Sequence, residues 1–265
     1  MAFKLWLTMS LTMLLLFGFL FGILATVGYY FSISGYLIVF FAILLVFIQW
    51  LISPYIIRWT TNMRLLTKDE YPWLWKTVKE LCKKNNAPVP RIAIVNSGSP
   101  NAFIFGRTPK SATLAITRGL LQMLTKDEVK AVVAHEIGHL KHKDMIVMTV
   151  VGAIPVIFYF VARFLMFAPS DRKKRSASSA ILVGVIAYLL YFITNLLVLA
   201  LSRLREYYAD YFSAKNTHPK LLIRALAKIT YGLGHTREKV NDAVRAFYIA
   251  DPLVSAEEIS QFSSY

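Results

Sequence analysis

The stretch Glu128-Val-Lys-Ala-Val-Val-Ala-His-Glu-Ile-Gly-His-Leu-Lys-His-Lys-Asp144 decides the fold that this sequence predicts. We expect a helix here, because Thr125 and Glu128 have the spacing of a capping box just before an apolar run. On a helix, His135 and His139 are about 40° apart around the axis and roughly 6 Å apart along it. Both imidazoles can therefore reach one divalent metal ion.

The residue that follows the first histidine indicates hydrolytic chemistry. A catalytic zinc ion uses three protein ligands and leaves one position for water. Glu136 stands where its carboxylate can accept the proton of a water whose pKa the metal has lowered. The chain has five histidines, and two of them fit this spacing. The motif therefore predicts a zinc hydrolase with one Zn2+ ion per chain and with Glu136 as the general base.

The third metal ligand must come from another part of the chain. Glu206 and Asp210 are four residues apart, so on a helix they share one face. We expect Glu206 to bind the metal and Asp210 to accept the N–H of a ligating histidine. His142 is a weaker candidate, because no turn brings it back toward the metal. The alternative is that the two carboxylates are solvated and balance Arg203 and Arg205.

The apolar composition predicts a membrane protein. The chain has 265 residues, 56% of them hydrophobic, and a mean hydropathy of +0.50. Residues Leu5–Ile57 carry no charge, and as one helix they would be about 80 Å long, more than twice the hydrocarbon thickness of a bilayer. The run must fold back, which gives spans near residues 5–28 and 36–57. Because it leads into a second span, we do not expect a cleaved signal peptide.

Two further uncharged runs, Met145–Ala162 and Ser176–Ser202, predict a second hairpin that crosses the membrane or lies in its interface. We therefore expect four transmembrane helices. The chain would then comprise a transmembrane hairpin (1–57), the first part of a catalytic domain (58–144), the second hairpin (145–202) and the second part of that domain (203–265).

The charge distribution indicates the side of the membrane. The net charge is +15, and fifteen Lys and Arg residues lie between Arg58 and Lys143. Positive charge next to spans is typical of the cytoplasmic side. Nucleic-acid binding is disfavoured, because the charge is dispersed and no recognition motif accompanies it. The only cysteine, Cys82, cannot form an intramolecular disulfide, which fits a reducing compartment.

The first polar part should begin with a helix over Tyr71–Lys84, opened by a capping box at Thr67 and Glu70. Three short strands with tight turns then indicate a small antiparallel sheet. The second polar part should hold helices over Arg203–Lys215 and Pro219–Leu233. The expected strands are 91–95, 101–105 and 112–117.

Two motifs together resemble the M48 metallopeptidases: Ala134-His-Glu-Ile-Gly-His139, and Arg205-Glu-Tyr-Tyr-Ala-Asp210 after two apolar segments. The four-span arrangement is similar to the HtpX branch of membrane-bound heat-shock proteases. Pro100-Asn-Ala-Phe103, Asp144 and Phe247-Tyr-Ile-Ala-Asp-Pro252 are supporting matches.

The resemblance implies a predominantly α membrane protein with a zincin-type α+β catalytic domain in the cytoplasm. It implies that His135, His139 and Glu206 bind zinc, that Glu136 is the general base, and that the substrates are damaged membrane proteins. Related chains are expected to continue beyond Pro252 with another helix.

Other functions are disfavoured. A CAAX-type processing protease of the same superfamily would have more spans and an enclosed chamber. An intramembrane protease would carry its motif inside an apolar span, whereas lysines at 126, 130, 141 and 143 surround this one. A zinc-binding scaffold without activity would have no need of Glu136.

The short strand at Asn101–Phe105 is the expected substrate-binding element. An extended peptide can add to the edge of a sheet through its backbone, so we expect Asn101, Ala102, Phe103 and Ile104 to align the substrate. Such pairing predicts a weak sequence preference. The alternative is that Phe103 belongs to the core and Asn101 to a turn.

Overall fold

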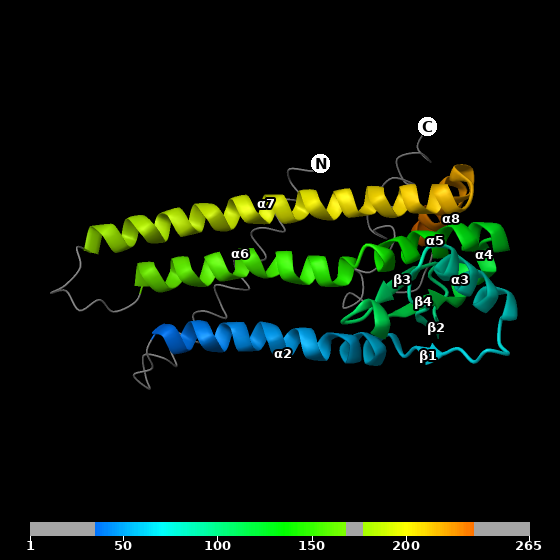
Figure 1. Ribbon diagram of the computed structural model, residues 1–265, viewed down its shortest axis with the longest axis horizontal. Coiled ribbons are helices and arrows are strands. Elements are labelled where there is room, and N and C mark those ends of the chain that lie inside the picture. Colours follow the sequence, from blue (N-terminus) through cyan, green and yellow to red (C-terminus); the bar gives the residue numbers. More distant parts are fainter. Residues whose placement is uncertain (1–34, 168–176, 236–265) are drawn as a thin grey trace. The chain divides into compact units, whose positions relative to one another are not determined.

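The computed structural model describes residues 35–167 and 177–235, which are mostly helical and include one small sheet (Figure 1). These residues fall into two compact units. The first unit, which we call the helical unit, contains residues 35–50, 148–167 and 177–202. The second, the sheet-bearing unit, contains residues 51–147 and 203–235.

Three long helices supply the helical unit: α2 (Gly35–Thr61), α6 (Asp144–Phe167) and α7 (Ala177–Asn216). Within this unit α6 and α7 pack through Tyr159 and Tyr191, whose ring centroids are 5.5 Å apart. Many large apolar side chains on α2 and α7 are nonetheless exposed. These include Phe40, Phe41, Ile43, Phe47, Leu182, Leu189, Ile193, Leu196 and Leu197.

The described residues do not establish the expected number of membrane spans. Among the described residues, one helix, Gly184–Asn216, is long and apolar enough to cross a membrane by itself. A second candidate is a bent pair of helices, Lys126–Lys141 and Asp144–Phe160. Four spans are therefore not confirmed, and the expected span at residues 5–28 lies outside the described residues.

The sheet has four strands in the order β1-β2-β4-β3, namely β1 (Arg64–Leu65), β2 (Arg91–Val95), β3 (Ala102–Phe105) and β4 (Thr113–Thr117). The three expected strands are confirmed, whereas β1 was not expected. The predicted antiparallel sheet is wrong, because β2 and β4 are parallel. Residues 96–101 carry the chain past the position of β4. The hairpin from β3 then brings β4 back between β2 and β3.

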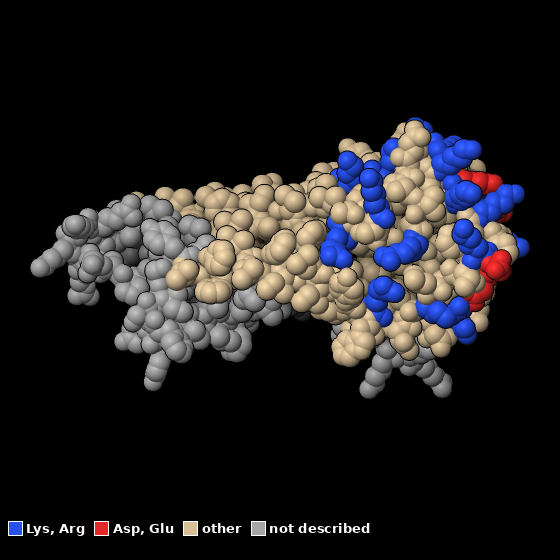
Figure 2. Space-filling view, turned by 60° about the horizontal axis from the view of Figure 1, so that its bottom comes forward, with Lys and Arg blue, Asp and Glu red and all other residues tan. Residues whose placement is uncertain are grey.

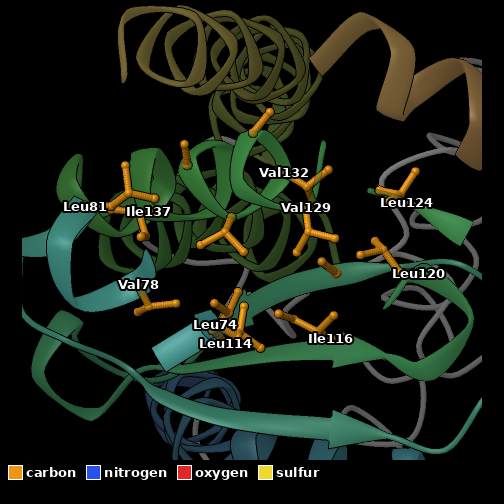
Figure 3. Close-up of a cluster of buried hydrophobic side chains, with 14 of the residues drawn as sticks. Leu74, Val78, Leu81, Leu114, Ile116, Leu120, Leu124, Val129, Val132 and Ile137 are labelled. Atoms are coloured by element: carbon orange, nitrogen blue, oxygen red, sulfur yellow. The ribbon is translucent and has the colours of Figure 1, made fainter. Parts of the chain in front are cut away.

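Helices α3 (Pro72–Lys84), α4 (Arg118–Met123), α5 (Lys126–Lys141) and α8 (Pro219–His235) complete this unit, with a short 3-10 turn, η1 (Pro109–Ser111). Figure 3 shows the core, in which apolar side chains of α3, β4, α4 and α5 face one another. Its labelled members are Leu74, Val78, Leu81, Leu114, Ile116, Leu120, Leu124, Val129, Val132 and Ile137.

The capping box expected at Thr67 and Glu70 does not cap a helix. The Thr67 backbone N–H does donate to the Glu70 carboxylate, at 3.1 Å. However, α3 begins later, at Pro72, and its N-cap is Tyr71 in the left-handed conformation, with φ 48°. Glu70 instead receives two hydrogen bonds from Arg64, at 2.6 and 2.8 Å. The motif therefore forms a turn that ties β1 to the start of α3.

The capping box at the start of α5 is confirmed. The Glu128 N–H donates to the Thr125 hydroxyl at 3.3 Å, and the Thr125 N–H donates to the Glu128 carboxylate at 2.8 Å. That carboxylate also pairs with Lys228 of α8 at 2.8 Å.

The other end of α5 differs from the expectation, because the stretch 128–144 is not one continuous helix. Helix α5 ends at Lys141, and Lys143 has a φ of 59°. A new helix, α6, starts at Asp144. The break places the Asp144 carboxylate at a helix N-terminus, one turn beyond the second histidine of the motif.

Candidate active site

Three side chains expected to bind metal come together from two helices. His135 and His139 of α5 have their Nε2 atoms 3.1 Å apart. The Oε2 atom of Glu206, on α7, lies 3.4 Å from His135 Nε2 and 3.6 Å from His139 Nε2. The three ligand atoms all lie within 4.8 Å of one another, so they can surround one ion.

The opposite side of each imidazole faces a carboxylate. Nδ1 of His139 lies 2.7 Å from Asp144 Oδ2. Nδ1 of His135 lies 2.9 Å from Asp210 Oδ1, although this contact is not aligned as a hydrogen bond. A carboxylate at Nδ1 favours a proton there and leaves the Nε2 lone pair available.

This donor set fits a zinc ion. Two Nε2 lone pairs and a carboxylate oxygen that converge would repel one another without a cation between them. Two nitrogens and one oxygen also match the ligands of catalytic zinc, with a fourth position left for water. Asp210 was expected beside a ligating histidine, and its Oδ1 lies 2.9 Å from His135 Nδ1, while its role stays a prediction. The contact of Asp144 with His139 was not expected, although an acidic residue five positions after His139 is a signal for it.

Close packing of α7 on α5 brings Glu206 to the two histidines. Gly138, between them in the motif, has no side chain to keep the helices apart, and a Cβ added there would lie 3.1 Å from the Ala209 Cα. One turn further on, the buried Ser213 hydroxyl donates to the Ala131 carbonyl at 2.7 Å. Small residues on both helices therefore set the register between the two halves of the site.

The electrostatics of the cluster favour a cation. Burial lowers the pKa of His135, but Asp210 and Glu206 raise it by more, to about 9. Burial also lowers the pKa of His139, but the hydrogen bond with Glu206 raises it, and the net effect is again a raised pKa. Contacts with both histidines hold the pKa of Glu206 well below its usual range, against the effect of burial. Glu206 is therefore a carboxylate at neutral pH.

Glu136 lies in a different environment from Glu206. It is buried, and burial raises its pKa, whereas the two neighbouring histidines lower it. The backbone N–H of Ile104 in β3 hydrogen-bonds its carboxylate. A buried carboxylate with a raised pKa can both accept and return a proton.

The expected substrate-binding residues lie in or next to β3, which is an edge strand of the sheet and, among the described residues, pairs with β4. The Asn101 N–H donates to the Thr117 hydroxyl at 2.8 Å, so it points into the sheet. The Thr117 N–H in turn donates to the Asn101 carbonyl. Because bonding directions alternate in an antiparallel pair, Ala102 and Ile104 turn their backbone groups to the open edge. Ala102 and Phe103 are buried, whereas Ile104 is partly exposed.

His142 lies away from the converging ligand atoms. It is the C-cap of α5, and its ring packs against Phe212, with centroids 6.2 Å apart. Its carbonyl accepts a hydrogen bond from Arg205 at 2.6 Å. The supporting motif at 247–252 lies outside the described residues.

Two imidazoles from one helix, a carboxylate from a second helix and a buried glutamate beside them are the features of a metal-dependent hydrolase. Comparison with known proteins supports this class and identifies the family within it. A family model described as Peptidase family M48 matches residues 68–259, which is most of the chain. The chain belongs to peptidase family M48.

Similar proteins match most of the chain. The chain is 40% identical over 239 residues to a protein described as "Protease HtpX homolog" from Methanothermobacter thermautotrophicus, with 89% of each chain covered. A second "Protease HtpX homolog", from Thermoplasma acidophilum, is 33% identical over 276 residues, which cover 97% of this chain and 86% of the relative. The chain is therefore a membrane metallopeptidase, with a metal cofactor and protein substrates.

A solved structure shares the fold. The crystal structure of S. mikatae Ste24p matches with a TM-score of 0.57 and 20% identity, over 96% of this chain and 66% of that chain. At this level of identity the likeness concerns the fold alone.

Proposed function

We propose that this protein is a membrane-bound zinc endopeptidase that hydrolyses peptide bonds of membrane or misfolded proteins in quality control. One observation carries the proposal: the ligand atoms of His135, His139 and Glu206 converge within 4.8 Å, and the buried Glu136 stands on the same helix as the histidines. Family membership supports the reaction class.

The chain's own residues account for the proton transfers. Zinc, when bound, would polarise the scissile carbonyl and lower the pKa of water. Glu136 takes the proton from the attacking water and returns it to the leaving amine. Burial raises the pKa of Glu136 above the usual value for a glutamate, which makes its protonated form easier to reach during the reaction. His135, His139 and Glu206 hold the metal, with Asp210 and Asp144 orienting the two imidazoles.

Removal of the metal should abolish cleavage. We expect detergent-solubilised protein treated with a chelator to stop cleaving casein, and stoichiometric zinc to restore the rate. The same cycle performed on Glu136→Gln should restore the metal but not the activity. Equal cleavage by the metal-free and zinc-loaded proteins would contradict a metallopeptidase mechanism.

The exposed side chains support contact with lipid. Large apolar residues on α2 and α7 face outward, more than a water-soluble surface usually presents. At the end of α2, Tyr55 and Trp59 are exposed, and these residue types gather at membrane interfaces. Figure 2 shows Lys and Arg gathered over the sheet-bearing unit on the face in view, which suits the cytoplasmic side.

We propose four crossings and a cytoplasmic active site. The site draws residues from both sides of segment 145–202, so that segment must cross twice or not at all. Single cysteines at the exposed Lys110 and Lys215, in a Cys82→Ser background, should both label from the cytoplasmic face. A probe at Lys173 should label from outside in intact cells. Labelling at Lys110 and Lys215 from opposite faces is incompatible with the shared site.

We also propose that β3 pairs with an extended substrate beside Glu136. Because the Ile104 N–H is bonded to Glu136, the substrate N–H groups would donate to the outward-facing carbonyls of Ala102 and Ile104. Backbone pairing has a period of two residues. Single N-methyl groups introduced along a fluorogenic peptide should therefore lower kcat/KM at alternate positions, by about 5-fold to 10-fold, since a hydrogen bond contributes about 1 kcal/mol. N-methylation five residues away is the control. Equal effects at adjacent positions would exclude strand pairing.

A further inference from the structure

Arg205 precedes Glu206 on α7 but points to a different set of partners. Its Nη2 donates to the His142 carbonyl, at 2.6 Å, and forms an ion pair with Asp144 Oδ1. The other oxygen of Asp144 lies 2.7 Å from His139 Nδ1. A continuous chain of contacts therefore runs from α7, through Asp144, to one of the histidines at the centre of the site.

The charges in this chain are poorly hydrated. The Arg205 side chain is 15% exposed and that of Asp144 is 10% exposed. Removing one partner of such a pair leaves the other charge buried and without compensation, which is strongly unfavourable. The orientation of Asp144, and with it the orientation of the His139 ring, therefore depends on a residue outside the ligand set.

Arg205 also joins three segments at the point where α5 ends. The His142 carbonyl belongs to the last turn of α5, and Asp144 opens α6. The planar guanidinium can hold a carbonyl and a carboxylate at fixed angles, whereas the shorter, rounder ammonium of lysine cannot reproduce that geometry. Because the next residue is Glu206, one turn of α7 carries the proposed ligand Glu206 and also the arginine that contacts Asp144, the carboxylate beside His139.

We propose that Arg205 is a positioning residue of the metal centre: it keeps the Asp144 carboxylate against His139 Nδ1 and so pre-orients His139 and Glu206 for the metal. The inference rests on the proposed zinc site. It assigns no contact between Arg205 and the substrate or the metal.

The test measures zinc affinity in full-length, detergent-solubilised protein. All variants carry Glu136→Gln, so that self-cleavage does not interfere, and zinc is titrated against a chelating indicator. Arg205→Gln and Asp144→Asn should each weaken zinc binding by about 10-fold to 100-fold, the usual effect of losing a group that orients a ligand. Arg205→Lys should recover part of the loss. Arg203→Gln, an exposed arginine on the same helix, should change affinity less than twofold.

The double variant separates positioning from simple stabilisation. If both residues act through one chain of contacts, Arg205→Gln with Asp144→Asn should bind zinc no more weakly than the weaker single variant. A purely structural role would lower the unfolding temperature of the metal-free protein and leave the zinc affinity of folded protein unchanged. That result, or effects that multiply in the double variant, would overturn the proposal.

Three further outcomes can be told apart. If Arg205→Gln does not fold, Arg205→Lys replaces it in the test. The inference is then overturned if Arg205→Lys and Asp144→Asn, as single variants, both bind zinc with wild-type affinity. If Glu206→Ala itself keeps full zinc affinity, the proposed site fails. If Glu206→Ala loses zinc while Arg205→Gln keeps it, only the role of Arg205 fails.

Discussion

Replacement of Glu136 by glutamine is expected to lower kcat/KM by about 10³-fold, within the range that general acid–base catalysis contributes. The amide has nearly the shape of the carboxylate but cannot accept a proton at neutral pH. The neighbouring histidines remain, so zinc should stay bound at one ion per chain. Cleavage of a fluorogenic peptide and metal analysis of the same sample test both statements.

The control for this variant is Glu80→Gln, an exposed glutamate on α3, which should retain full activity. Circular dichroism should show the same helix content in both variants. A Glu136→Gln protein that holds zinc and cleaves within 10-fold of the wild-type rate would remove Glu136 from the reaction.

Replacement of Glu206 by alanine should abolish tight metal binding. Its carboxylate is the part of the ligand set that comes from α7, and two histidines from one helix leave a catalytic zinc site incomplete. The Glu206 side chain is 59% exposed, so the fold should survive its loss. After dialysis, plasma emission should find about one zinc per wild-type chain and almost none in the variant.

The matched control is His142→Ala, because His142 follows the two histidines of the motif at the end of α5 and its ring packs against Phe212. It should keep its zinc. Full zinc content in Glu206→Ala combined with loss in His142→Ala would reverse the assignment of the third ligand.

Local signals explain which parts of the fold the sequence could predict. The capping box at Thr125 and Glu128 and the histidine spacing act within one or two turns of a helix, so α5 follows from its own residues. Thr67 and Glu70 show the limit of such signals. The same spacing occurs there, but the helix begins only at Pro72, with Tyr71 as its N-cap. The Glu70 carboxylate accepts hydrogen bonds from Arg64 and forms part of a turn.

Long-range contacts could not be predicted from the same signals. The position of β4 between β2 and β3 depends on how the chain crosses after β2, which strand patterns do not specify. The pair of Arg205 and Asp144 joins residues far apart in the sequence, and its members look like ordinary charges on helices. Glu206 was expected beside the histidines because the zinc motif lacks a third ligand and because Glu206 and Asp210 share one helix face, and the family resemblance supported this choice.

The most direct test of the central claim is an anomalous difference map at the zinc edge, from crystals of the Glu136→Gln protein. We predict one peak per chain, in contact with Nε2 of His135, Nε2 of His139 and the Glu206 carboxylate, with zinc–nitrogen distances of about 2.0–2.1 Å. A peak elsewhere, or one held by His142 with Glu206 turned away, would contradict the proposed active site.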